Sequence, residues 1–156
     1  MKTVLLGMLA ATAFGLMQAG AAQATSLVAR VDVPTQTMQV IQYGKVIHTW
    51  PVSTARPGYI TPAGNWRPKR MHKMWYSRKY DMSPMPYSVF YDGGYAIHGT
   101  SAVSRLGTPA SHGCVRLETE NAKTFYELVR EVGPGNTRVI VIRDAATVAD
   151  ASAKRL

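Results

Sequence analysis

Ser111-His112-Gly113-Cys114-Val115-Arg116-Leu117 holds the only cysteine among the 156 residues of this chain. A second cluster, Ile97-His98-Gly99-Thr100, puts another histidine sixteen residues before the thiol. A free cysteine without such neighbours is usually a buried, inert side chain. Two histidines and two glycines around one thiol instead predict that Cys114 is a nucleophile.

The two histidines are alternative bases for this thiol. A thiol attacks a carbonyl as the thiolate, which a histidine within hydrogen-bond reach generates by taking the proton. His112 is two residues from Cys114, so in an extended loop it shares the face of the thiol without reaching the sulfur well. His98 is expected at the end of a separate strand. This geometry favours His98 as the base and gives His112 a local role.

The glycines predict how the backbone assists the reaction. Gly113 lets the chain bend just before the thiol, so that the amides of Gly113 and Cys114 converge as an oxyanion hole. Gly99 allows close packing and leaves its carbonyl free to orient the imidazole of His98.

The candidate substrate-binding residues lie in the two clusters or just before one of them: Ser111, Arg116, Tyr95 and Thr100. The hydroxyl of Ser111 is suited to fixing the loop. Arg116 is either a cation that stabilises the loop or a clamp for a substrate carboxylate. Trp75 or Tyr76 is a further candidate for lining a substrate groove.

The rest of the chain predicts a mostly β domain. Alternating apolar and polar residues, bounded by turn residues, predict strands at 26–33, 37–42, 46–52 and 137–143, and a hairpin at 87–98. Residues 53–68 read as a long connection rich in Gly, Pro and Thr, and residues 71–76 fit either a strand or a loop.

One segment predicts the main α-helix. Apolar residues recur at three- and four-residue spacing from Ala122 to Val132, and Gly133-Pro134-Gly135 ends the pattern. Thr119 is the expected N-cap. The cysteine segment then falls in the loop that leads into this helix.

The N-terminus predicts export. Lys2 precedes an apolar run from Val4 to Met17 and a small-residue site ending in Ala22-Gln23-Ala24, as in a signal peptide over residues 1–24. An uncleaved membrane anchor is the alternative. We expect one catalytic domain over residues 25–145, in the periplasm or cell envelope, and a flexible tail over residues 146–156.

The chain is basic, with a formal net charge of +9. An exported protein rarely meets nucleic acid, so an acidic envelope polymer is the better partner for this charge. A merely solubilising surface explains the charge equally well. With one cysteine the chain forms no internal disulfide, although small exported domains often rely on them.

These residues together resemble the signature of the L,D-transpeptidase (YkuD-type) catalytic domain. The similarity runs from about Ser26 to Arg143. Besides the two clusters, it rests on four shorter motifs: Trp50-Pro51-Val52-Ser53-Thr54, Thr61-Pro62-Ala63-Gly64, Met85-Pro86-Tyr87 and Leu106-Gly107.

The resemblance implies a β-sandwich with a small helical element and an enzyme of peptidoglycan biosynthesis. It implies that Cys114 attacks the carbonyl before the terminal D-Ala of a tetrapeptide stem and forms a thioester. His98 is then the general acid/base, the Gly99 carbonyl orients it, and the amides of His112, Gly113 and Cys114 stabilise the oxyanion.

The acyl acceptor stays open. A second stem gives a 3→3 cross-link, an envelope-protein lysine gives an attached protein, a free D-amino acid gives an exchanged stem, and water gives a carboxypeptidase or amidase. We expect a monomer that needs no cofactor or metal.

Three other classes remain as alternatives. His98, His112 and Cys114 resemble a zinc site with an open position, although no further ligand stands at the usual spacing. A different wall-cleaving thiol peptidase usually places the cysteine before the histidine. A non-catalytic peptidoglycan-binding module is disfavoured because every catalytic position is filled.

Overall fold

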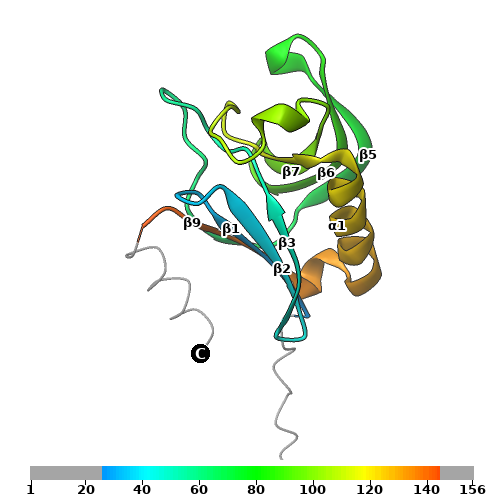
Figure 1. Cartoon of the computed structure of the whole chain (residues 1–156). Coiled ribbons are helices and arrows are strands. Elements are labelled where there is room, and N and C mark those ends of the chain that lie inside the picture. The colour runs from blue at the N-terminus through cyan, green and yellow to red at the C-terminus, as the bar shows by residue number, and fades with distance from the viewer. Residues whose placement is uncertain (1–25, 145–156) are drawn as a thin grey trace, which may run out of the picture.

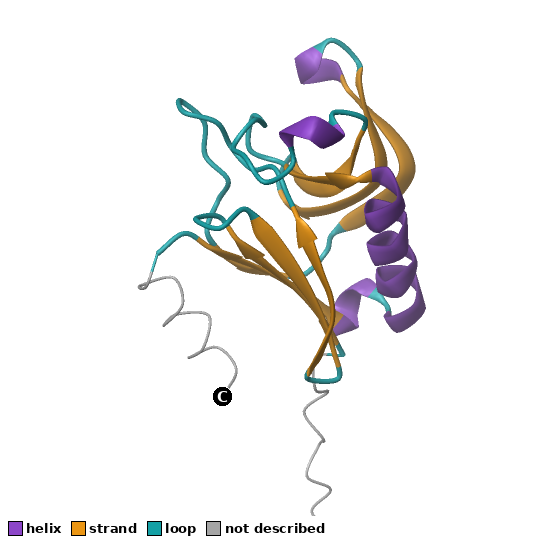
Figure 2. Ribbon diagram, in the orientation of Figure 1, coloured by secondary structure: helices purple, strands orange, loops and turns teal. Residues whose placement is uncertain are grey.

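The fold consists of two β-sheets and one main helix (Figure 1; Figure 2). The computed structural model describes residues 26–144, so the predicted signal peptide and the predicted tail at 146–156 lie outside the described residues. Within residues 26–144, none of the helices combines the length and the hydrophobicity needed to cross a membrane.

The first sheet has the strand order β3-β2-β1-β9-β4. Its strands are β1 (Leu27–Asp32), β2 (Thr37–Gln42), β3 (Lys45–Pro51), β4 (Gly64–Trp66) and β9 (Thr137–Ile142). The central pair β1 and β9 is parallel, and the other neighbours are antiparallel. The sequence predicted four of these strands, and all four are confirmed: β1, β2, β3 and β9. β4 lies inside the predicted connection at 53–68 because a three-residue strand carries no periodic signal and forms by pairing with β9.

The second sheet has the order β5-β6-β7-β8. Its strands are β5 (Arg70–Ser77), β6 (Ser83–Asp92), β7 (Tyr95–Thr100) and β8 (Val115–Glu118). The predicted hairpin is confirmed as β6 and β7, and the ambiguous residues 71–76 belong to β5. Residues 77–83, which we call the hairpin tip, join β5 to β6 through the 3₁₀-helix η1 (Arg78–Tyr80) and stand at the top of Figure 1.

β8 corrects the expectation of a loop after the cysteine. It runs parallel to β7, with Ile97 opposite Val115 and His98 opposite Arg116. Four residues are too few for the alternation to show in the sequence. The pairing partner lies in another part of the chain, so only the folded sheet reveals the strand.

The main helix α1 (Thr119–Val132) packs against β6 and β7. Four of the five residues that the helical spacing predicted are buried, namely Ala122, Phe125, Tyr126 and Val129, and the fifth, Val132, is partly buried at the end of the helix. The predicted N-cap is wrong by one residue, because β8 extends to Glu118 and this residue takes the cap position without a side-chain cap bond. Thr119 instead donates from Oγ1 to the carbonyl of Thr100 at 3.4 Å. Two further 3₁₀-helices are η2 (Val103–Arg105) and η3 (Pro134–Asn136).

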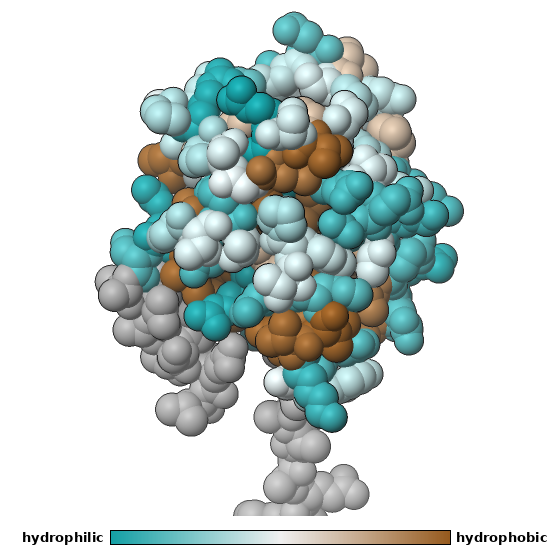
Figure 3. All heavy atoms as spheres, viewed as in Figure 1, coloured by the Kyte–Doolittle hydropathy of each residue, from teal (hydrophilic) through white to brown (hydrophobic). Residues whose placement is uncertain are grey.

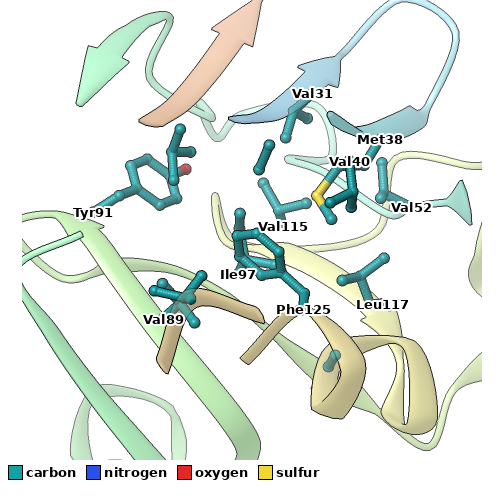
Figure 4. Packing of buried hydrophobic residues seen from close by; sticks show 14 of the residues in the cluster. Val31, Met38, Val40, Val52, Val89, Tyr91, Ile97, Val115, Leu117 and Phe125 are labelled. Carbon is teal, nitrogen blue, oxygen red and sulfur yellow. The ribbon is translucent and has the colours of Figure 1, made fainter. Parts of the chain in front are cut away.

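The core lies between the sheets and α1 (Figure 4). Leu27, Ala29 and Val31 of β1 point into it, as the alternation predicts, and Phe125 of α1 joins the same cluster as Ile97. Each fully buried large apolar side chain contributes about 1.5–3 kcal/mol. On the face drawn in Figure 3, hydrophobic residues form separate patches among hydrophilic ones. Since the single cysteine is free, packing and hydrogen bonds hold this fold.

Candidate active site

A cavity of about 530 Å³ lies between the β5–β6 hairpin and the segment that carries Cys114. Five residues of the two sequence clusters line it: His98, Thr100, His112, Cys114 and Arg116. They come from β7, from β8 and from residues 111–114, which we call the cysteine loop. The parallel pairing of β7 with β8 is what brings the two sequence clusters together.

Ser111 fixes the cysteine loop from within. Its side chain is fully buried, and its Oγ donates to the carbonyl of Cys114 at 2.7 Å. The same Oγ accepts the N–H of Gly113 at 2.9 Å. The loop-fixing role expected for Ser111 is therefore visible in the geometry. The Gly113 amide, however, holds the loop, so the predicted oxyanion donors that remain are the amides of His112 and Cys114.

Gly113 adopts a conformation that favours glycine, with φ of +128°. A Cβ at this position would collide with the ring of Tyr95 and would lie 2.7 Å from the carbonyl oxygen of Ile60. The carbonyl of Gly113 accepts the hydroxyl of Thr61 at 2.9 Å. Tyr95, predicted to bind substrate, thus packs beneath the loop, and neither it nor Ser111 is among the described residues that line the cavity.

His98 is buried in the interior of β7. The expectation that it ends its strand is wrong by two residues, because pairing with β8 carries β7 to Thr100. Nδ1 lies 2.8 Å from the carbonyl oxygen of Gly99, so Nδ1 carries the proton and donates it. Burial lowers the pKa of His98 to about 4, against the opposing effect of the Gly99 hydrogen bond, and Arg116 lowers it further. The ring is therefore neutral at pH 7, and Nε2 is the nitrogen that carries no proton.

Gly99 is held between two elements. A Cβ there would lie 3.0 Å from both the side chain of Pro86 and the backbone of Thr119. Its carbonyl is thereby fixed against the imidazole of His98 by the packing of β6 and α1. This is the close packing that the sequence predicts for this glycine.

Cys114 is half-buried at the cavity wall, directly before β8. Its Sγ lies 4.0 Å from the carbonyl oxygen of Gly94, a distance typical of a weak S–H···O contact. Burial raises the pKa of the thiol, while hydrogen bonding by the backbone of Ala96 and the charge of Arg116 lower it in part. The opposite directions of the Cys114 and His98 shifts favour a neutral thiol and a neutral imidazole in the resting protein.

His112 occupies a different environment. Its ring stacks on Tyr80 at 4.3 Å between centroids, and Tyr59 meets it edge-on at 4.6 Å. Burial, then Arg56, Arg116 and Lys79, lower the pKa of His112. The ring is thus clamped between aromatic side chains, which fits the local role expected for it.

Arg116 contacts the loop and also reaches the cavity, so both roles that the sequence left open remain predictions. Its half-buried guanidinium donates to the carbonyl of Ala110 at 3.5 Å and also lines the cavity. Burial lowers its pKa, Cys114 opposes this shift, and Arg56 adds to it. Thr100 also lines the cavity, and its Oγ1 accepts the N–H of Ala102 at 3.2 Å.

Several lining residues were missed by the sequence reasoning: Arg70, Arg78, Lys79 and Tyr80. The basic clusters at residues 67–70 and 78–79 were a visible signal, but the chain alone does not tell which of these cations face the thiol. Of the two aromatic candidates, Trp75 lines the cavity, whereas Tyr76 is exposed and is not among the described lining residues.

Residues 26–144 contain no group of three or more His, Cys, Asp or Glu side chains arranged to hold a metal ion. The zinc alternative requires His98, His112 and Cys114 to converge on one point. His112 is engaged with aromatic rings, and Nδ1 of His98 with a carbonyl.

Residues 26–141 match the model of the YkuD family, described as the L,D-transpeptidase catalytic domain. The chain belongs to this family. Its matched region covers both sheets, α1 and the cavity.

Curated relatives of this L,D-transpeptidase domain match over a shorter stretch. The probable L,D-transpeptidase YbiS of Escherichia coli K12 is 47% identical over 58 residues, which are 36% of this chain and 18% of that protein. The probable L,D-transpeptidase ErfK/SrfK of Salmonella typhimurium is 38% identical over 56 residues, or 36% of this chain and 17% of that protein. The matched stretch is therefore less than a fifth of each relative.

Solved L,D-transpeptidases share the fold over three quarters of the chain. The enzyme from Stackebrandtia nassauensis superposes with a TM-score of 0.67 at 30% identity, covering 76% of this chain and 56% of that one. L,D-transpeptidase 3 of Mycobacterium tuberculosis, in complex with a faropenem-derived adduct, superposes with a TM-score of 0.63 at 22% identity. The match covers 76% of this chain and 60% of that one.

Proposed function

We propose that the chain is a cysteine acyltransferase that transfers the acyl end of a peptidoglycan stem peptide to an amine. The observation that carries this proposal is one cavity lined by both Cys114 and His98, with the His98 ring fixed by the Gly99 carbonyl at 2.8 Å. Membership of the L,D-transpeptidase family supports the choice of a stem peptide as acyl donor.

Attack begins from a neutral pair. Because the pKa of His98 is lowered and that of Cys114 is raised, the thiol keeps its proton until the substrate is bound. Nε2 of His98 takes this proton as Sγ bonds to the carbonyl carbon between the third residue and the terminal D-Ala. The carbonyl π electrons move to oxygen and give a tetrahedral oxyanion.

Backbone amides of the cysteine loop stabilise the oxyanion in this proposal. The amides of His112 and Cys114 are assigned this role, since the Gly113 amide is bound to Ser111. One such donor typically lowers the barrier by about 2.7–4 kcal/mol. Collapse breaks the C–N bond, and His98 returns its proton to the departing D-Ala amine, leaving a thioester on Cys114.

The second half repeats these steps in reverse. An acceptor amine attacks the thioester carbon, His98 takes the amine proton, and the C–S bond breaks to regenerate the Cys114 thiol. The candidate acceptors are a second stem, an envelope-protein lysine and a D-amino acid. Transfer to water would make the chain an L,D-carboxypeptidase or amidase by the same path.

The cellular setting completes the proposal. Export by the signal peptide at residues 1–24 places a monomeric domain, residues 25–145, in the periplasm or cell envelope, where it acts in cell-wall organisation and cell shape. No cofactor is assigned to the reaction. The basic charge of the chain suits a wall polymer whose stems carry carboxylates.

Incubation with a disaccharide tetrapeptide tests the proposal. The wild-type chain is expected to release D-Ala and to gain the mass of the acyl group, whereas Cys114→Ala does neither. His48→Gln, a change outside the cavity, serves as the matched control and keeps activity. Activity that survives Cys114→Ala, or that a chelator abolishes, would sink the mechanism.

Two further readouts sharpen this test. Faropenem is expected to acylate the wild-type protein but not Cys114→Ala, by analogy with the adduct of L,D-transpeptidase 3. Competing acceptors, namely a second stem, a lysine-bearing envelope protein, glycine and water, then identify the group that resolves the thioester. Retention on sacculi without any change in muropeptides would indicate a binding module instead.

A further inference from the structure

The cavity is lined by cations from both of its walls. Arg70, Arg78 and Lys79 come from the β5–β6 hairpin, and Arg116 comes from β8. No Asp or Glu is among the described residues that line the same cavity. A concave site with one sign of charge attracts ligands of the opposite sign, so this cavity suits an acyl donor with more than one carboxylate.

These cations occupy distinct places relative to the thiol. Arg116 lies close enough to Cys114 to lower the pKa of the thiol, and both residues line the cavity. Arg70 stands at the start of β5, where its guanidinium lies 4.0 Å above the ring of Phe90 and 5.3 Å from that of Trp75. Arg70 is therefore positioned over the aromatic wall.

An apolar wall joins the two places. Met85, Phe90 and Ala96 form a buried cluster, and both Trp75 and Cys114 pack against it. The thiol thus touches one part of this cluster, while the guanidinium of Arg70 covers another part at Phe90. A ligand side chain that extends from the thiol along this wall therefore contacts apolar surface first and then the guanidinium of Arg70.

We propose that Arg70 is a specificity-determining residue that binds a carboxylate at the end of the side chain of the donor's third residue. This inference rests on the proposed function, because the carbonyl of that third residue is the one that Cys114 attacks. The methylene stem packs on Trp75 and Phe90, and the carboxylate accepts paired N–H bonds from the guanidinium.

The same arrangement disfavours a lysine at the third position. A lysine side chain would bring a lone ammonium toward Arg70, and no carboxylate among the described lining residues offsets the repulsion. A diaminopimelate side chain carries a carboxylate beside its ammonium, so it satisfies Arg70. The predicted donor class is therefore a stem whose third residue ends in a free carboxylate.

Matched stem peptides test this subsite. We compare D-Ala release from tetrapeptides with diaminopimelate, with diaminopimelate amidated at its side-chain carboxyl, and with lysine at the third position. The wild type is expected to favour the free carboxylate about tenfold in kcat/KM, the size of one charge-assisted hydrogen bond. Arg70→Gln is expected to bring this ratio close to one.

Arg67→Gln is the control for charge. Arg67 is exposed on the same basic segment and is not among the described lining residues, so its loss is expected to leave the ratio unchanged. Equal use of the three donors by the wild type, or an equal loss on all of them in Arg70→Gln, would overturn the subsite.

A binding measurement separates this inference from the proposed function. Calorimetry with Cys114→Ala and the corresponding tripeptides is expected to show about tenfold tighter binding of the free carboxylate, a preference absent from the double variant with Arg70→Gln. Wild-type protein that releases no D-Ala from any stem contradicts the proposed function, while this binding ratio still decides the subsite. Equal affinities for the three tripeptides contradict the subsite even in an active transpeptidase.

Discussion

The two walls of the cavity are held in different ways. The cysteine loop is fixed by buried hydrogen bonds. The hydroxyl of Ser111 accepts the N–H of Gly113 and donates to the carbonyl of Cys114, and the amide of Ser111 donates to the carbonyl of Thr54 at 2.9 Å. The hairpin tip is largely exposed, and one of its contacts with the opposite wall is the stacking of Tyr80 on His112. We therefore expect the cysteine loop to be the rigid wall of the cavity and the hairpin tip to be the adjustable one.

Backbone strain follows the same division. Asp81 and Met82 in the hairpin tip have φ of 48° and 55°, and both residues are exposed. A left-handed conformation costs a non-glycine residue about 1–2 kcal/mol. In the cysteine loop the residue with positive φ is a glycine, Gly113, so the wall that holds Cys114 carries less strain of this kind.

The largest effect is expected from breaking the rigid wall. Gly113→Ala would push the ring of Tyr95 and the carbonyl of Ile60 away from the loop and displace Cys114. We expect D-Ala release to fall on the order of a thousandfold, about 4 kcal/mol of barrier. Gly107→Ala is the control, because it has φ of +85° with nothing within 4 Å, and it should lose about 1 kcal/mol of stability while retaining activity. An active Gly113→Ala enzyme would contradict the rigid-wall assignment.

The pH dependence of stability is expected to follow the buried base. In the unfolded chain His98 takes up a proton near its ordinary pKa of about 6.5, whereas in the folded protein its pKa is about 4. Between these values the unfolded state binds more protons, so the free energy of unfolding falls as the pH is lowered from about 6.5 to 4. The expected loss from this residue is about 3 kcal/mol.

Urea unfolding at a series of pH values measures this contribution. His98→Gln should flatten the profile between pH 4 and 6.5. His48→Gln controls for the loss of an imidazole outside the cavity and should follow the wild type. A profile for His98→Gln that is as steep as that of the wild type would show that the folded protein does not hold this ring neutral.

The smallest effect on activity is expected from a substitution in the adjustable wall, the hairpin tip. Tyr80→Ala removes the stack on His112 but no buried hydrogen bond. We expect KM for the stem peptide to rise roughly threefold to tenfold, with kcat and the free energy of unfolding nearly unchanged, within about 0.5 kcal/mol. Tyr76→Ala, on the exposed face of β5, is the control for loss of a tyrosine. A fall in kcat as large as that of Gly113→Ala would erase the distinction between the walls.

Local patterns predicted most of the elements because they depend on neighbours in sequence. Alternation identified β1 and β2, the glycine turn identified the β6–β7 hairpin, and the spacing from Ala122 to Val129 identified the buried face of α1. β4 and β8 escaped, since each is short and forms only through a partner distant in the chain. The one-residue error at Thr119 has the same origin.

The sequence by itself determined the family, through two clusters at a fixed separation, and the candidate pair Cys114 and His98. Only the tertiary structure decided that the Gly113 amide binds Ser111, that Tyr95 supports the loop, and that Arg70 faces the cavity. The physical reason is how far apart in sequence the interacting residues lie. Residue type and spacing specify the chemistry that a side chain carries, whereas the direction of an amide or a cation depends on strands that pair across long stretches of chain.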